Sequence, residues 1–125
     1  MSNKKILVVD DDNVFIELID MCLSKRSIDI YSSNNITEAA EVFCEHNHDF
    51  DAVILDRQMP GGDGNEFLRA IRNKYNSSVP VMMLTGKNDT KDIISSLEIG
   101  ANDYIVKPFG VDEFVSRFKK MINMD

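Results

Sequence analysis

The sequence predicts an α/β fold, in which a parallel sheet is covered by helices on both faces. Strand-like and helix-like patterns alternate from one end of the 125 residues to the other. The core strands are continuous apolar runs, as in Ala52–Asp56, which is typical of strands buried on both faces. Because each of the five predicted strands is followed by a helical pattern, right-handed crossovers arrange them in one parallel sheet.

Each predicted strand is an apolar run that ends at turn-forming residues. In chain order, the predicted strands cover residues 5–10, 29–32, 52–56, 80–84 and 103–107. The second strand is shorter and more polar than the others, so we expect it near an edge of the sheet. The third leads directly into Met-Pro-Gly-Gly-Asp-Gly, which breaks regular structure, so we expect Asp56 at the carboxyl end of a central strand.

The first three predicted helices begin at residues whose side chains cap a helix. Asn13, Asn35 and Asp63 are the expected caps. Glu38 and Glu66, three residues after the second and third caps, are typical of a capping box. The apolar residues expected on the buried faces of these helices are Phe15, Leu18, Ile19, Cys22, Ala39, Ala40, Phe43, Phe67, Leu68 and Ile71.

The last two predicted helices cover residues 90–99 and 111–123. Gly100 follows the fourth helix and is its expected C-terminal cap, a position that favours glycine. The apolar residues of these two helices that we expect to face the core are Ile93, Ile94, Leu97, Phe114, Val115, Phe118 and Ile122.

Composition and charge narrow the classes of function. A chain of 125 residues forms one domain, and its formal net charge of −7 repels phosphate backbones, so we expect no direct nucleic-acid partner. No apolar run approaches the roughly 20 residues that cross a bilayer, and the first residues lack a signal-peptide core. We therefore expect a cytoplasmic protein with no membrane contact. Cys22 and Cys44 are too few for a disulfide scaffold and are expected to be free thiols.

Polar residues stand at the carboxyl ends of four predicted strands: the acidic triplet 10–12, Asp56, Thr85 and Lys107. In a parallel sheet these ends converge on one rim. Two carboxylates about 4 Å apart repel by about 4 kcal/mol at an effective dielectric near 20, so a cation must offset the cluster. Mg²⁺ with oxygen ligands fits this need, and Lys107 adds a further positive charge.

Taken singly, each of these residues has a simpler explanation. The acidic triplet forms a turn and caps the first helix, Thr85 is a β-branched strand end, and Lys107 is a solvated lysine. Together, these explanations do not account for the polar groups that end all four of the predicted core strands, while the predicted edge strand has none of them.

Four motifs resemble one known family, the receiver domain of two-component response regulators. They are V-V-D-D-D at 8–12, L-D-R-Q-M-P-G-G-D-G at 55–64, M-L-T-G at 83–86 and G-A-N-D-Y-I-V-K-P-F at 100–109. The resemblance covers essentially the whole chain and is closest to single-domain, chemotaxis-type regulators. It implies a flavodoxin-like, doubly wound sheet in the strand order 2-1-3-4-5 with five helices. It also implies one receiver domain over residues 1–125, with no output domain in this chain.

By this resemblance, Asp56 accepts a phosphoryl group from a histidine of a sensor kinase or of a phosphotransfer protein. Asp11 ligates Mg²⁺ directly and Asp10 assists through water, while Asp56 and the backbone carbonyl of Gln58 complete the protein ligands. The resemblance implies no conventional enzyme, only Mg²⁺-dependent self-phosphorylation and autodephosphorylation at Asp56.

The same resemblance assigns roles to the later motifs. Thr85 hydrogen-bonds one phosphoryl oxygen and Lys107 pairs with another, while Tyr104 is the switch aromatic that follows Thr85 inward. Lys107-Pro108 matches a pair whose peptide bond is typically cis in the family. Arg57 departs from the family pattern, which more often has an apolar residue after the phosphoacceptor; it is expected to contact a partner or cover the site.

The resemblance also implies a downstream protein target, bound by the face of the fourth helix, fifth strand and fifth helix. We expect a monomer or a dimer that depends on phosphorylation. Glu113 and Arg117 resemble charges that some receivers use across a dimer interface, although an exposed pair four residues apart on one helix is the simpler interpretation.

Two other functions fit part of the pattern. Haloacid-dehalogenase-type phosphatases also use an aspartate nucleophile, Mg²⁺, a hydroxyl and a lysine, but their nucleophile lies in a D-x-D signature on the first strand. A flavin-binding protein with this fold is disfavoured by the acidic rim and by the lack of a Gly/Ser/Thr-rich loop after the first strand. A zinc site at Cys44, His46 and His48 lacks a second ligand cluster, so a solvated helix end is favoured.

Overall fold

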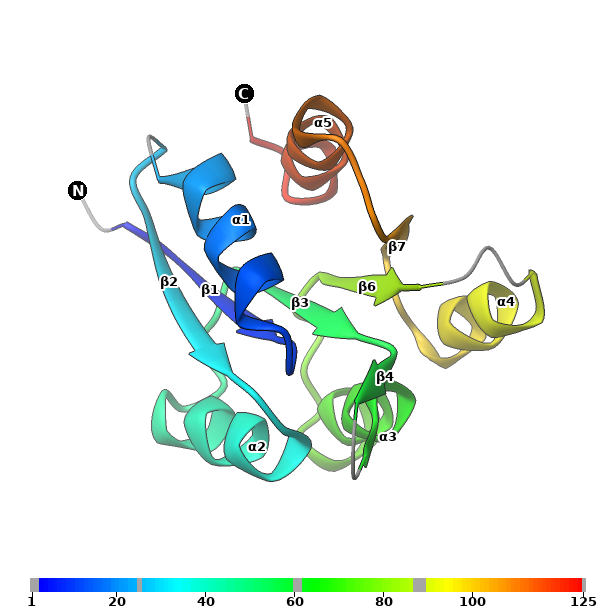
Figure 1. Cartoon of the computed structure of the whole chain (residues 1–125). Helices are drawn as coiled ribbons and strands as arrows, with labels where there is room; N and C mark the ends of the chain where they lie inside the picture. The colour runs from blue at the N-terminus through cyan, green and yellow to red at the C-terminus, as the bar shows by residue number, and fades with distance from the viewer. Residues whose placement is uncertain (1–2, 25, 60–61, 87–89, 125) are drawn as a thin grey trace.

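The computed structural model of the chain describes residues 3–24, 26–59, 62–86 and 90–124. Pro60 and Gly61 of the second motif lie outside these ranges. The described residues form a five-stranded parallel sheet in the order β2-β1-β3-β6-β7, which confirms the predicted 2-1-3-4-5 arrangement (Figure 1). Its strands are β1 (Lys4–Val9), β2 (Ile28–Ser33), β3 (Ala52–Asp56), β6 (Val81–Thr85) and β7 (Asp103–Val106).

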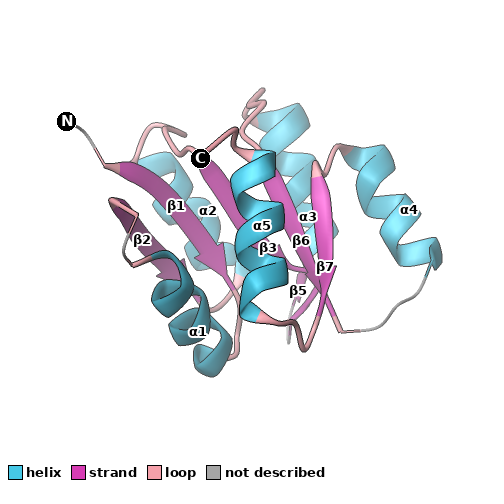
Figure 2. Cartoon of the chain, turned by 90° about the horizontal axis from the view of Figure 1, so that it is seen from above, coloured by secondary structure: helices cyan, strands magenta, loops and turns pink. Residues whose placement is uncertain are grey.

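The sheet is covered on both faces by helices, as predicted. In the described residues, these are α1 (Asn13–Leu23), α2 (Ile36–Glu45), α3 (Gly64–Arg69), α4 (Thr90–Ile99) and α5 (Val111–Met121), and a π-helical turn, Ala70–Lys74, continues α3. Helices α1 and α5 pack on one face and α2 and α3 on the other, while α4 lies beside α3 near the β7 edge (Figures 1 and 2). None of these helices combines the length and the apolar character needed to cross a membrane.

Two apolar clusters lie on the two sides of the sheet. One contains Phe43 and Phe67 of α2 and α3, and the other contains Ile19 of α1 with Phe114 and Phe118 of α5. Strands β1 and β3 contribute alternate residues to both clusters, and all five residues of β3 are buried. The central strands are therefore continuous apolar runs because both of their faces are buried, as predicted.

Helix capping follows the predictions with one correction. The Asn35 and Asp63 side chains accept hydrogen bonds from the backbone of Glu38 (2.8 Å) and Asn65 (2.9 Å), as expected. At α1, however, Asp12 and not Asn13 is the cap, and its carboxylate accepts a bond of 2.9 Å from the Val14 amide. Both residue types cap helices well, so their adjacent positions left the start of the helix uncertain by one residue.

The fourth helix departs most from the expected core. Ile94 and Leu97, both predicted to be buried, are 48% and 41% exposed, and Ile93 is only partly buried. The buried residue of α4 is instead Ser96, which donates a hydrogen bond of 2.8 Å to Asn65 on α3. Because α4 lies near the edge of the sheet, its apolar stripe has no second layer to cover it.

The other helices agree more closely with the predicted core. Phe67, Leu68 and Ile71 are buried, whereas some residues expected inside are only partly buried, because they lie at the margins of the helix faces. These partly buried residues are Phe15, Leu18, Ala40, Val115 and Ile122. The break after Asp56 contains a short antiparallel pair that was not predicted, β4 (Gln58–Met59) with β5 (Gly62–Asp63).

Candidate functional site

The carboxyl ends of four strands bring the predicted site residues together. Asp10 follows β1, Asp56 ends β3, Thr85 ends β6 and Lys107 follows β7. The register pairs Val9 with Leu55 and also aligns Thr85 with Val106, so these ends lie at the same level of the sheet. Carboxylate oxygens of Asp10, Asp11 and Asp56 lie within 4.8 Å of one another.

Asp10 is fully buried, and its charge is balanced by Lys107. The ammonium of Lys107 lies 2.7 Å from Asp10 Oδ2 and 3.4 Å from Asp56 Oδ2. Asp10 Oδ1 accepts a hydrogen bond of 2.9 Å from the Asp12 amide. Burying a carboxylate without such partners would cost several kcal/mol, and the contact with Lys107 offsets this cost.

Lys107 remains a cation in this environment. Burial lowers its pKa, but the hydrogen bond with Asp10 and the charges of Asp56 and Asp10 outweigh burial, so that the pKa lies above its ordinary value. The ammonium also lies 4.2 Å from the centroid of the Phe15 ring, which attracts a positive charge.

The carboxyl group of Asp56 has a pKa raised to about 6. Burial is the main cause and the negative charge of Asp10 is the second, while Lys107 and a hydrogen bond from the Gln58 amide (3.2 Å) partly oppose them. The Asp56 carboxyl is therefore mostly ionised at neutral pH, in a site where negative charge is not fully compensated.

The acidic cluster suits a hard divalent cation. It combines two buried carboxylates, Asp10 and Asp56, with the exposed carboxylate of Asp11, and Mg²⁺ prefers such oxygen ligands. Gln58 adjoins the cluster through the bond from its amide to Asp56. Its carbonyl, predicted as a further ligand, stays a prediction.

The alternative zinc site has no counterpart among the described side chains. His46 packs edge-on against Tyr31, with ring centroids 4.5 Å apart, and His48 stacks on Phe43 at 5.0 Å. Where the structure describes the chain, the Asp10, Asp11 and Asp56 group is the one suited to a metal ion. Cys22 and Cys44 are free thiols, as predicted.

Thr85 and Tyr104 both line one small cavity. Thr85 is 6% exposed, and its carbonyl accepts a hydrogen bond of 2.6 Å from the Lys107 amide, which connects the ends of β6 and β7. Tyr104 is partly buried, and the Arg117 guanidinium lies 5.6 Å from its ring centroid. The two residues of the predicted switch pair therefore line the same cavity.

The segment from β7 to α5 was the subject of two further predictions. The Lys107-Pro108 peptide bond is cis, as the family resemblance implied. Arg117 pairs with Asp103 at 2.9 Å, so the predicted pair with Glu113 is not the interaction formed.

Gly64 fixes the loop behind the phosphoacceptor candidate. A Cβ atom at this position would lie 2.2 Å from the carbonyl oxygen of Asp56, so a side chain cannot be accommodated without moving the backbone. The Gly64 amide also donates a hydrogen bond of 2.9 Å to the Arg57 carbonyl. The first turn of α3 is therefore packed directly against the end of β3.

Asn34 and Phe15 were not predicted as parts of the site. The Asn34 amide donates to the carbonyl of Asp10 at 3.1 Å and to Asn13 Oδ1 at 2.9 Å, and so connects the end of β2 to the acidic turn. A polar residue just after a parallel strand was the signal for Asn34. Phe15 was assigned to the core face of its helix, and no sequence signal indicated its contact with Lys107.

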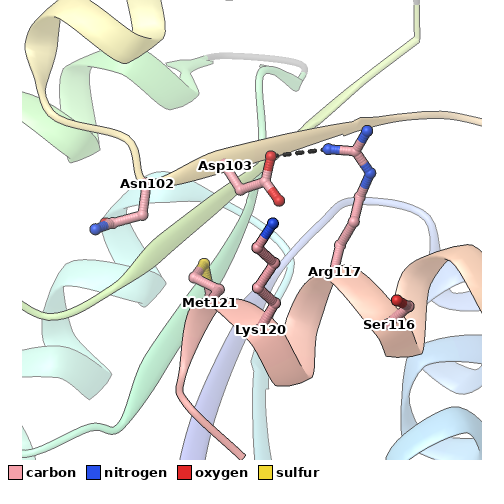
Figure 3. Close-up of a pocket in the computed structure, with 6 residues that line it drawn as sticks. All are labelled: Asn102, Asp103, Ser116, Arg117, Lys120 and Met121. Atoms are coloured by element: carbon pink, nitrogen blue, oxygen red, sulfur yellow. Dashed lines mark hydrogen bonds and ion pairs between the residues drawn. The ribbon is translucent and has the colours of Figure 1, made fainter.

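A separate hollow on the surface lies between the start of β7 and the end of α5 (Figure 3). In that view, Arg117 reaches Asp103, and the ammonium of Lys120 points toward the same carboxylate. The side chains lining it are Asn102, Asp103, Ser116, Arg117, Lys120 and Met121. None of them belongs to the predicted site.

Known proteins resemble the chain over nearly its whole length. The family model of the response regulator receiver domain matches residues 6–119. The receiver domain of Francisella response regulator 1452 has 30% identity and a TM-score of 0.83, covering 97% of this chain and 98% of that one. The BeF3-activated N-terminal receiver domain of Klebsiella pneumoniae RstA has 30% identity and a TM-score of 0.84, covering 97% and 100%.

The fold likeness extends to a chemotaxis protein. CheY4 of Vibrio cholerae has a TM-score of 0.85 at 24% identity, covering 95% of this chain and 98% of that chain. At this identity the match supports the flavodoxin-like fold.

Proposed function

The chain belongs to the response regulator receiver domain family of two-component systems, and from this premise we propose that Asp56 is its phosphoacceptor. The phosphodonor is a phosphohistidine of a sensor kinase or a histidine phosphotransfer protein. The observation that carries the proposal is the setting of Asp56, a buried carboxylate with a pKa of about 6, beside Lys107 and the acidic pair Asp10 and Asp11.

In the proposed reaction, a lone pair on an Asp56 carboxylate oxygen forms the new O–P bond. The P–N bond of the phosphohistidine breaks, and its electron pair stays on the imidazole nitrogen. Lys107 pairs with one phosphoryl oxygen and the Thr85 hydroxyl donates a hydrogen bond to another. Both groups oppose the charge repulsion that makes a carboxylate a weak nucleophile toward a phosphoryl group.

Asp10, Asp11, Asp56 and the Gln58 carbonyl are the proposed Mg²⁺ ligands. When bound, Mg²⁺ supplies positive charge that offsets the carboxylates and the phosphoryl oxygens. Lys107, whose ammonium lies 2.7 Å from Asp10, adds a further positive charge at the same cluster. Turnover is limited to Mg²⁺-dependent self-phosphorylation and autodephosphorylation at Asp56.

The proposed output is a change in the face of α4, β7 and α5. Phosphorylation adds a group carrying about −1.5 to −2 charges, which draws the Thr85 hydroxyl inward and lets Tyr104 follow. The exposed apolar side chains on this face are those of Ile94, Leu97 and Val111, which suit a protein target. Residues 1–125 act as one receiver domain in this proposal, cytoplasmic and either monomeric or dimeric on phosphorylation.

Incubation with Mg²⁺ and acetyl phosphate tests the proposal by intact mass. We expect the wild type to gain one phosphoryl group and Asp56→Asn to gain none. Asp49→Asn changes an exposed aspartate that precedes β3, whereas Asp56 ends that strand, so it is the matched control and is expected to gain the group normally. Catalytic turnover of a phosphomonoester without a stable phosphoprotein would instead support the phosphatase alternative.

A further inference from the structure

Arg57 connects the strand that carries Asp56 to helix α4. Its guanidinium lies 2.5 Å from Asp63, the cap of α3, and 3.5 Å from Asp92 in the first turn of α4. The Arg57 side chain is only 16% exposed. Because water screens such a partly buried pair less than a surface pair, the contact with Asp92 contributes to the position of α4.

The same guanidinium lines the cavity between Thr85 and Tyr104. Asp92 and Ser96 of α4 form another part of its wall. The cavity has a volume of about 10 Å³, which is the space of about one water molecule. A tyrosine ring therefore cannot enter unless the side chains of the wall move apart.

Movement of Thr85 toward a phosphoryl group on Asp56 clears only one side of this cavity. The lining also includes Arg57 and, on α4, Asp92, Ile93 and Ser96, which the movement of Thr85 leaves in place. Entry of the Tyr104 ring into so small a space therefore also requires α4 to move away from Arg57. Arg57 Nε is buried and has no hydrogen-bond partner among the described residues. An entering phenol offers this guanidinium a ring face and an oxygen acceptor, which offset the loss of the pair with Asp92.

We propose that Arg57 is a positioning residue, a latch that holds α4 through Asp92 in the unphosphorylated protein and releases it as Tyr104 enters. The proposal rests on phosphorylation at Asp56 as the proposed function. It gives a role to the one position beside the phosphoacceptor candidate where this sequence departs from the family pattern. Phosphorylation then reaches α4 by two routes, through Thr85 and Tyr104 and through Arg57.

Amide hydrogen exchange of residues 90–99 tests the latch in the unphosphorylated protein. We expect Arg57→Met and Asp92→Asn each to speed exchange about two- to fivefold, and the double variant to exceed neither single variant by more than experimental error. Arg69→Met, an exposed arginine on α3 with no ion pair among the described residues, is expected to leave this exchange unchanged. Exchange equal to that of the wild type in both single variants would overturn the latch.

The second arm measures the same exchange with Mg²⁺ and acetyl phosphate, alongside intact mass. We expect phosphorylation to raise exchange of residues 90–99 in the wild type, and to raise it less in Arg57→Met, where the latch is already open. An equal rise in both proteins, with normal phosphorylation, would overturn the coupling while leaving the proposed function intact. Failure of the wild type to gain a phosphoryl group would overturn the proposed function itself.

Discussion

Helices α4 and α5 flank the same strand, β7, but different forces hold them. In α5, Phe114 and Phe118 are fully buried and stack with ring centroids 5.9 Å apart. In α4, by contrast, the buried residue is Ser96, and two of its apolar residues face outward. The sequence patterns of the two helices are alike, yet one is anchored in the core and the other is not.

Polar contacts hold α4 at three points along its length. Its first turn meets Arg57, its middle meets Asn65, and its C-terminal end is bound by Arg72, whose guanidinium donates to the Gly100 carbonyl at 2.8 and 3.1 Å. A hydrogen bond contributes about 0.5–1.5 kcal/mol, whereas one fully buried large apolar side chain contributes about 1.5–3 kcal/mol. Within the face of α4, β7 and α5, helix α5 is therefore the more firmly held part, and α4 is the part that shifts more easily.

The largest expected effect comes from removing an anchor of α5. Phe118→Ala is expected to lower the free energy of unfolding by about 3–5 kcal/mol, because it leaves a cavity in a closely packed cluster. Leu97→Ala on α4 is expected to cost less than about 1 kcal/mol, since that side chain is largely in water. Urea denaturation of both variants measures the difference, and equal losses would contradict it.

Asp56→Asn tests how the buried charge at the rim affects stability, close to where Arg57 contacts α4. The pKa of Asp56, about 6 in the folded state, lies above its unfolded value, so the folded protein is destabilised once the carboxyl ionises. We expect Asp56→Asn to raise the free energy of unfolding by about 1–3 kcal/mol at pH 7. The gain is expected to be absent below about pH 4 and to grow up to about pH 6–7.

Denaturation of the wild type and the variant across this pH range is the measurement. Asp49→Asn, whose carboxyl is exposed, serves as the control. A difference between Asp56→Asn and the wild type that did not change with pH would contradict the assigned cause.

The smallest of the three effects is expected at the middle contact of α4. Ser96→Ala removes the hydroxyl that donates to Asn65 Oδ1 and leaves that buried oxygen without this bond, at a cost of about 1–2 kcal/mol. We expect hydrogen exchange to speed up mainly in residues 90–99 and to change little in α5. Equal acceleration in both helices would show that they move as one unit, against the comparison.

Much of the fold and of the candidate site could be predicted from the sequence. The continuous apolar runs predicted buried parallel strands, and the polar residues after them predicted one shared rim, because strand ends of a parallel sheet coincide. Asp10, Asp56 and Lys107 do meet there. The order of the strands followed from the family resemblance and not from the pattern itself.

The remaining features depend on three-dimensional distances that a pattern does not contain. Ile94 and Leu97 form an apolar stripe that looks the same whether it faces a core or faces outward. One of the two partners of Arg57, Asp92, lies 35 positions away, and nothing in the intervening sequence points to it. Asp12 and Asn13 are both good caps, so only the backbone geometry distinguishes them.

The buried pair of Asp10 and Lys107 joins residues that lie 97 positions apart in the sequence. Asp10 is synthesised well before Lys107, so a growing polypeptide carries the acidic triplet without this counter-charge until β7 and the residue after it have been made. A nascent chain therefore lacks the charge balance that the site requires. Charge compensation at the rim and the addition of β7 to the sheet are therefore a single event in folding.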